Sequence, residues 1–202
     1  MSKRLRLKAD NVSCERGGRM VIENLSFEIE NGCLVALRGP NGAGKSTLLR
    51  LLAGLNVPSG GKLTLEGGAP DASIPEQCHY VGHSDALKPA LTVRENLDFW
   101  TDFLGEEKSN SALEGFGLRD LADDQVMFLS AGQKRRLALS RLIPIARPIW
   151  LLDEPTVGLD SKSLDRLSSH MHVHLATGGI VIAATHADLG IAVSQTITLG
   201  VA

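Results

Sequence analysis

The sequence predicts an α/β fold with a mixed sheet core, in which N-terminal antiparallel β hairpins precede parallel strands, and with an inserted helical subdomain. Three observations support this prediction. Alternating polar and apolar residues precede Gly32, which is typical of hairpin strands. Continuous apolar runs at 33–37, 149–152 and 180–185 are typical of strands buried on both faces. Helical patterns dominate between residues 92 and 147.

The predicted hairpins occupy the chain to about Gly32. Leu25, Phe27 and Ile29 alternate with polar residues, and the Glu-Asn-Gly sequence that follows them supplies a turn. The basic residues between positions 3 and 8 alternate with leucines, so we expect them to form the polar face of an edge strand.

The α/β core begins with the apolar run at 33–37. This strand leads through a glycine-rich loop into a leucine-rich helix, which Gly54 and Pro58 end. Short strands are expected at 62–66 and 79–81.

A helical subdomain is expected at about 84–145, inserted between strands of the core. A capping-box pattern at 92–95 begins a helix in which Leu97, Trp100 and Leu104 share one face. We expect aromatic residues of this helix, Phe99 and Trp100, to form the core of the insert.

A further helix at about 161–175 is expected between the last two predicted strands. No linker, repeat or low-complexity tract interrupts the chain, and 202 residues are ample for one hydrophobic core. Residues 1–202 are therefore predicted to form a single domain.

Charge and cysteine content restrict the function. A formal net charge of -2 gives no electrostatic reason to expect a nucleic-acid partner. The 3 cysteines have no C-x-x-C spacing, which favours free thiols in a reducing compartment. No apolar run approaches the ~20 residues of a membrane helix, and the N-terminus lacks a signal-peptide pattern. We therefore expect any role at a membrane to be peripheral.

A phosphate-binding loop is predicted between the strand at 33–37 and the helix after it. The sequence G-P-N-G-A-G-K-S matches G-x-x-x-x-G-K-[ST] in the strand-to-helix context that the motif requires. The lysine would reach the β- and γ-phosphates, and the serine hydroxyl would hold Mg²⁺. The predicted ATP-binding residues are Gly39, Pro40, Asn41, Gly42, Ala43, Gly44, Lys45, Ser46 and Thr47.

An acidic pair ends the apolar strand at 149–152. Ligands bind at the carboxyl ends of strands in open α/β sheets, so Asp153 and Glu154 are candidate site residues. Asp153 would bind Mg²⁺ through water, and Glu154 would act as general base on the attacking water.

Three further motifs resemble those of the ABC ATPase family. The sequence L-S-A-G-Q at 129–133 resembles the family signature, with an alanine for a glycine. The run 153–160 resembles its Walker B motif and D-loop, which ends in Asp160, and His186 resembles its switch histidine. The resemblance implies a P-loop NTPase fold of ABC type and hydrolysis of Mg-ATP in which Lys45, Glu154 and His186 take part.

The signature also has a local structural meaning. Ser130 is a good N-cap and Gln133 falls at the third helical position, so a helix should begin here. In ABC ATPases this helix start contacts ATP bound to a second subunit. The resemblance therefore implies a homodimer in which Ser130, Ala131, Gly132 and Gln133 contact the partner's nucleotide.

The chain departs from the family pattern at two positions. Arg16 stands where family members often place an aromatic residue, and its guanidinium plane could stack on adenine. His83 stands where the Q-loop glutamine is expected and is a candidate contact to Mg²⁺ and to a membrane partner; Gln77 is the alternative.

These departures narrow the resemblance to the ATP-binding subunits of cytochrome c maturation systems. That resemblance implies small integral membrane partners and a peripheral location on the cytoplasmic face of a bacterial inner membrane. The work driven by ATP would be haem export or release of a haem-loaded chaperone. The segment 83–91 would be the coupling surface, with Leu87, Pro89 and Leu91 exposed.

Two other classes of function stay open at this point. One is a soluble ABC ATPase of the iron–sulfur assembly type, and the other is a P-loop kinase of a small molecule. A metal or haem site at His170, His172 and His174 is not favoured, because only positions 170 and 174 share a helix face.

Overall fold

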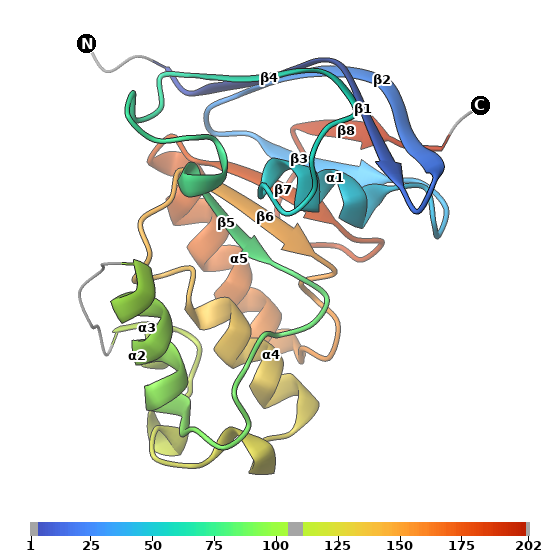
Figure 1. The fold of residues 1–202 in the computed structure, drawn as a ribbon. Helices are drawn as coiled ribbons and strands as arrows, with labels where there is room; N and C mark the ends of the chain where they lie inside the picture. The colour runs from blue at the N-terminus through green and yellow to red at the C-terminus, as the bar shows by residue number, and fades with distance from the viewer. Residues whose placement is uncertain (1–3, 105–110, 201–202) are drawn as a thin grey trace.

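Two β-sheets and five α-helices make up the part of the chain that the computed structural model describes, residues 4–104 and 111–200. The three-stranded sheet is antiparallel with order β2-β1-β4, and the five-stranded sheet is parallel with order β5-β6-β7-β3-β8. The predicted mixed sheet thus consists of two separate sheets, with α1 between them (Figure 1).

The strands are β1 (Arg6–Arg16), β2 (Arg19–Glu30), β3 (Leu34–Arg38), β4 (Gly60–Glu66), β5 (Cys78–Val81), β6 (Ile149–Asp153), β7 (Ile180–Ala184) and β8 (Gln195–Thr198). The α-helices are α1 (Lys45–Leu52), α2 (Val93–Leu104), α3 (Ser111–Gly115), α4 (Ala131–Ser140) and α5 (Ser161–Ala176). Short 3-10 turns lie at Pro75–Gln77, Arg119–Leu121 and Val126–Phe128. The strands and helices that were predicted with residue bounds are confirmed to within two residues, whereas β8 and α3 were not predicted as separate elements.

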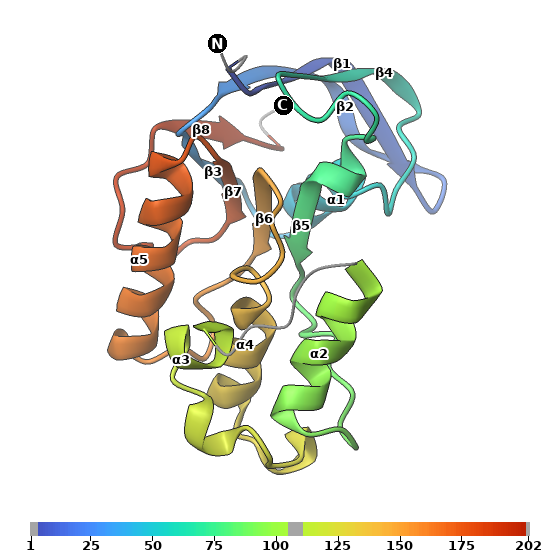
Figure 2. The ribbon, with the colours of Figure 1, turned by 90° about the vertical axis from the view of Figure 1, so that its left-hand side faces the viewer.

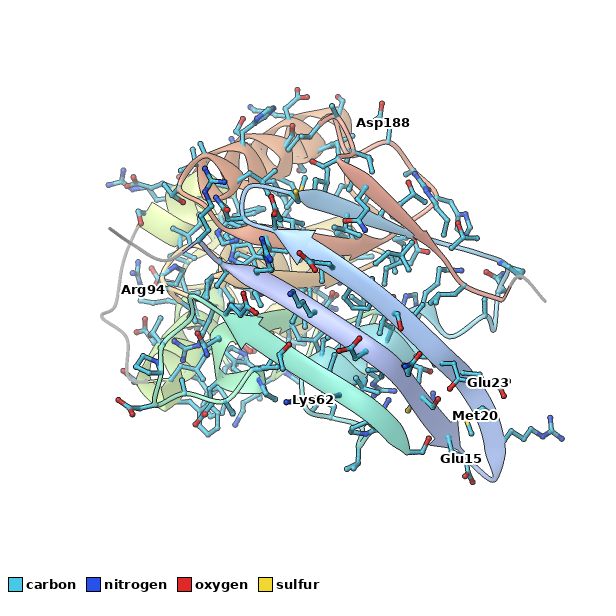
Figure 3. All side chains as sticks on the ribbon, turned by 90° about the horizontal axis from the view of Figure 1, so that it is seen from above. Glu15, Met20, Glu23, Lys62, Arg94 and Asp188 are labelled. Atoms are coloured by element: carbon cyan, nitrogen blue, oxygen red, sulfur yellow. The ribbon has the colours of Figure 1, made fainter. Side chains whose placement is uncertain are left out.

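The N-terminal strand is central in its sheet, so the prediction of an edge strand is wrong. β1 pairs with β2 on one side and with β4 on the other. The polar face was predicted correctly: Arg6 forms ion pairs of 3.2 Å with both Glu28 and Glu30 across the sheet. Figure 3 shows the three strands side by side, with Glu15 and Met20 near the hairpin tip.

The parallel sheet is buried on both faces because neighbouring residues of each strand enter different cores. In β6, Leu151 packs against the side that carries α1, whereas Leu152 packs against the side that carries α5. In β7, Ile182 packs on the α1 side of the sheet and Val181 packs on the α5 side. This two-sided burial explains why the strands read as continuous apolar runs.

The helical subdomain lies between β5 and β6 in the chain. Its helices α2, α3 and α4 gather at the end of the molecule farthest from the three-stranded sheet (Figure 2). Their contact face includes Leu97, Leu113, Phe116 and Leu137, all of them buried.

The expectation that Phe99 lies in the core of this subdomain is wrong. Phe99 is 37% exposed and stacks on Phe103, while Trp100 is half-buried. The buried face of α2 includes the polar residue Asn96, whose side chain accepts a hydrogen bond from the Lys88 amide and donates to the Lys88 carbonyl. Because these bonds satisfy the side-chain amide, Asn96 can lie beside Leu97 on the buried face of α2.

The first turn of α2 provides a test of the capping box. The Thr92 amide donates to Glu95 Oε2 at 2.7 Å, and the Glu95 amide donates to Thr92 Oγ1 at 3.1 Å, as predicted. Thr92→Ala removes one acceptor and should lower the free energy of unfolding by about 0.5–2 kcal/mol. Urea denaturation would measure this loss, and Thr92→Ser, which keeps the hydroxyl, is the control. Equal stability of Thr92→Ala and Thr92→Ser would contradict the prediction.

Candidate functional site

The predicted phosphate loop connects β3 to α1, which begins at Lys45 as expected. Gly39, Gly42 and Gly44 have φ values of 139°, 84° and 99°, which only glycine adopts without strain. The Lys45 ammonium donates to the Gly39 and Pro40 carbonyls at 2.7 and 3.0 Å. The loop therefore folds around the Lys45 ammonium, which was predicted to bind phosphate.

A hydroxyl and a carboxylate meet beside this loop. Ser46 Oγ donates to Asp153 Oδ1 at 3.0 Å, from the first turn of α1 and the end of β6. Hydroxyl and carboxylate oxygens are the ligands that Mg²⁺ prefers, usually with waters and substrate phosphates completing its shell. The residues present therefore fit the predicted metal.

Glu154 has a constrained backbone at the end of β6. Its φ of 47° is in the left-handed region, which costs a non-glycine residue about 1–3 kcal/mol. The Glu154 amide donates to the Ala184 carbonyl of β7 at 2.8 Å, and its carbonyl accepts from Arg135 Nη2 at 2.9 Å. These two contacts restrain the backbone of the turn at Glu154 from two sides.

His186 follows β7 at the same edge of the sheet and is exposed. The buried Thr185 before it accepts a hydrogen bond from the Ala187 amide at 3.1 Å, and its carbonyl accepts from Arg38. In the sheet, Leu37 and Asp153 both align with Ala184. The phosphate loop, the acidic pair and His186 therefore leave three adjacent strands at one edge.

The signature forms the predicted helix start. The Gln133 amide donates to Ser130 Oγ at 3.2 Å, and the Ser130 amide donates to Gln133 Oε1 at 2.7 Å, so the capping box is confirmed. Ser130 and Ala131 are exposed. Gly132 lies against the loop after β6, where an added Cβ would be 2.6 Å from the Gly158 carbonyl oxygen.

Asp160, the D-loop residue, has a structural role that the sequence analysis did not identify. Its carboxylate accepts a hydrogen bond from the Ser163 amide at 2.8 Å and caps α5. Hydrogen bonds from Ser163 hold the pKa of Asp160 below its ordinary value. The D-loop is thereby tied to the start of a helix.

His83 and Gln77, the two candidates for the Q-loop residue, differ in their surroundings. His83 is exposed and lines a groove together with Ser46 and Asp153. The alternative, Gln77, is buried, and its side-chain amide bonds to the backbone of Ala69 and Ala72. Gln77 is thus occupied within its own loop, which favours His83.

Arg16 lies at the exposed end of β1, where it pairs with Arg19 of β2. The same hairpin approaches the phosphate loop, because a Cβ added at Gly44 would lie 3.1 Å from Val21. The structure therefore brings the hairpin that carries Arg16 next to the phosphate loop.

The groove beside His83 has a volume of about 870 Å³ and lies between β5 and α2. The Arg141 guanidinium is 4.7 Å from the centre of the Trp100 ring at this groove. Burial lowers the pKa of Arg141 to about 10 and that of the adjacent His79 to about 3. The groove is thus lined both by the aromatic ring of Trp100 and by the buried side chains of Arg141 and His79.

The expected apolar patch along 83–91 is only partly present. Pro89 is exposed, but Leu87 and Leu91 are half-buried, so the prediction is wrong for both leucines. Leu87 packs against the core below the loop, which is why it is not available at the surface. The large exposed apolar side chains of the helical subdomain are Phe99, Phe103, Met127 and Phe128.

Two of the three histidines of α5 pack against aromatic rings, and His172 is exposed. His170 stacks on Phe116 with ring centres 5.1 Å apart, and His174 stacks on Trp150 at 4.0 Å. Among residues 4–104 and 111–200, no group of three or more His, Cys, Asp or Glu side chains could hold a metal ion.

Comparison with known proteins identifies the family. The family described as ABC transporter matches residues 22–157. A Nitrobacter winogradskyi protein named "Cytochrome c biogenesis ATP-binding export protein CcmA" is 53% identical over 193 residues, 95% of this chain and 96% of that protein. The chain belongs to the CcmA family of ABC-type ATP-binding proteins.

Other relatives agree with this assignment. A CcmA protein of Bradyrhizobium diazoefficiens is 53% identical over 93% of this chain and 94% of its own length. A bacterial Atm1-family ABC exporter, solved with ATP bound, superposes with a TM-score of 0.83 at 27% identity. That match covers 98% of this chain and 37% of the exporter chain. This CcmA-family chain is an ATPase and binds ATP.

Within the described ranges, no helix of this chain is both long and apolar enough to cross a bilayer.

The close approach of the signature to the D-loop leads to a prediction. Gly132→Ala would force the Gly158 carbonyl to move, since the new Cβ would lie 2.6 Å from it. Overpacking of this kind should cost about 1–3 kcal/mol of unfolding free energy and lower ATP turnover. Urea denaturation and phosphate release would measure both effects.

The control for this variant is Gly60→Ala, where the added Cβ would lie 3.9 Å from the Ser13 Cβ, an ordinary contact. If Gly132→Ala were as stable and active as Gly60→Ala, the contact would not constrain the signature.

Proposed function

We propose that this chain is the ATP-hydrolysing, energy-coupling subunit of a membrane complex for cytochrome c maturation. One observation carries the proposal: three adjacent parallel strands deliver Lys45, Ser46, Asp153, Glu154 and His186 to a single edge. The names of relatives that are 45–53% identical over nearly the whole chain support the biological setting.

The proposed chemistry is attack of water on the γ-phosphorus of ATP with cleavage of its bond to the β–γ bridging oxygen. The Lys45 ammonium, now bonded to two loop carbonyls, would neutralise the β- and γ-phosphates. Glu154 would accept the proton of the attacking water at its carboxylate, and His186 would orient the γ-phosphate. Ser46 and Asp153 would hold Mg²⁺, which supplies positive charge to the phosphates.

The proposed active form is a two-fold homodimer with ATP between the subunits. The start of α4 carries exposed Ser130 and Ala131 in a capping box, with the positive end of the helix dipole beside them. Such a helix start suits a phosphate. We infer that Ser130, Ala131, Gly132 and Gln133 contact ATP in the other subunit, and that Asp160 lies near this interface.

The proposed membrane partner is a small integral membrane protein that docks at the groove beside His83. The groove combines Trp100 and Leu104 with the basic side chains of Arg50 and Arg141. It adjoins Ser46 and Asp153, so a docked segment would contact the nucleotide site directly. With such a partner, the chain would lie peripherally on the cytoplasmic face of the bacterial inner membrane.

We further infer that residues 1–202 act as one nucleotide-binding domain whose helical subdomain, about 84–145, carries the signature. ATP energy would then drive haem export or release of a haem-loaded chaperone. The two alternatives are less well supported. The listed relatives' names favour cytochrome c biogenesis over iron–sulfur assembly, and the capped signature helix has no role in a small-molecule kinase.

The first test of this function is Lys45→Ala. Because the ammonium stabilises charge that develops on the phosphates, its loss should lower ATP turnover by about 10²-fold or more. Phosphate release would be measured with Mg-ATP. Lys62→Ala, which removes an exposed lysine of β4, is the control and should retain turnover. A Lys45→Ala protein with normal turnover would refute the assignment of the loop.

A second test concerns the dimer. Glu154→Gln keeps the shape of the side chain but cannot accept the proton, so the protein should bind ATP, fail to hydrolyse it and accumulate as a dimer. Size-exclusion chromatography with light scattering, with and without ATP, would measure this shift. Glu23→Gln, on exposed β2, is the control. A Glu154→Gln protein that stays monomeric with ATP at all concentrations would contradict the sandwich arrangement.

A further inference from the structure

One buried arginine connects the signature helix to the end of β6 and to the loop that carries His83. Arg135 lies on α4 and is only 4% exposed. Its Nη2 atom donates to the Asp153 and Glu154 carbonyls at 2.8 and 2.9 Å, and its Nε atom donates to the Pro155 carbonyl at 3.4 Å. Three consecutive carbonyls of the catalytic turn therefore converge on one guanidinium.

The other side of the same guanidinium holds the loop after β5. Nη1 donates to the Gly82 carbonyl at 2.8 Å and to Asp85 Oδ1 at 2.9 Å. These two residues flank His83, which lines the groove with Ser46 and Asp153. The ion pair between Arg135 and Asp85 has side-chain exposures of 5% and 26%, so solvent screens it less than the surface pairs of β1.

The contact with Glu154 matters because the backbone there is strained. A left-handed glutamate persists only where the surrounding structure fixes it from more than one side. The Ala184 carbonyl fixes the Glu154 amide, and Arg135 fixes the Glu154 carbonyl. If Arg135 moved, the turn would lose one of these restraints and the carboxylate would lose its direction.

We propose that Arg135 is a positioning residue that couples the 82–85 loop to the carboxylate of Glu154. A segment docked in the groove would shift this loop, and the Gly82 and Asp85 contacts would transmit the shift through the guanidinium to the catalytic turn. This inference rests on the proposed role of Glu154 as general base. A lysine could not replace the arginine, because its donors radiate from one atom and cannot span both segments.

The first experiment compares Arg135→Lys with the wild-type protein in steady-state ATP hydrolysis. The charge is kept and the bridge is lost, so kcat should fall roughly 10- to 100-fold, the effect of a misplaced catalytic group. KM for ATP should change less than about twofold, because the phosphate loop is untouched. The matched control is Arg166→Lys, since Arg166 also donates to two backbone carbonyls, those of Glu114 and Gly115.

A second measurement distinguishes a positioning role of Arg135 from a merely structural one. In the Glu154→Gln background, Arg135→Lys should leave ATP-driven dimer formation intact, because it changes neither the phosphate loop nor the capping box at the start of α4. Loss of that dimer, or a kcat decrease that matches a decrease in nucleotide-binding stoichiometry, would overturn the positioning role. If kcat of Arg135→Lys equalled that of the wild-type protein, the positioning role would also be overturned, but the proposed function would stand. An inactive wild-type protein would instead overturn the proposed function and this inference together.

The link to the 82–85 loop is tested by a double-mutant cycle. If Asp85 acts through Arg135, the double variant Asp85→Asn/Arg135→Lys should lose about as much kcat as Arg135→Lys alone. Losses that multiply would show that the two residues act independently and would overturn the coupling.

Discussion

The alignment of three parallel strands is the constraint on which the rest of the site depends. Leu37 of β3 and Asp153 of β6 both align with Ala184 of β7, so the three following loops begin at the same level of the sheet. Parallel strands place their carboxyl ends together, and here those ends supply a phosphate loop, an acidic pair and a histidine. A shift of one strand by a single residue would separate Ser46 from Asp153 and would turn the buried faces of that strand to the wrong cores.

Much of this arrangement follows from local sequence signals. The strands could be predicted because burial on both faces makes them continuous apolar runs, and the two capping boxes could be predicted because their partners lie three residues apart. Contacts between distant segments could not be predicted in this way. β1 is central because β4 pairs with it, and nothing within residues 6–16 specifies that partner.

The buried polar residues show the same limit. In the run Lys134-Arg135-Arg136, only Arg135 is buried, and neither charge nor spacing distinguishes it from its neighbours. Its acceptors come from segments about 20 and 50 residues earlier or later in the chain, as the pairs with Pro155 and Asp85 illustrate. Asn96 likewise occupies the core of the helical subdomain because bonds to Lys88 satisfy it. Apolar periodicity treats such polar residues as surface positions and therefore does not identify them as part of the core.

The strained turn at Glu154 is restrained by contacts from two parts of the structure, the parallel sheet and the helical subdomain. The proposed general base, Glu154, directly follows a strand in which successive residues point to opposite faces. The left-handed φ of 47° breaks that alternation after Asp153, and the broken strand needs restraints from outside itself. The sheet supplies one through Ala184, and the helical subdomain supplies the other through α4. Consequently the backbone that carries the Glu154 carboxylate depends on how the helical subdomain packs against the core, which is the dependence that the proposed coupling role requires.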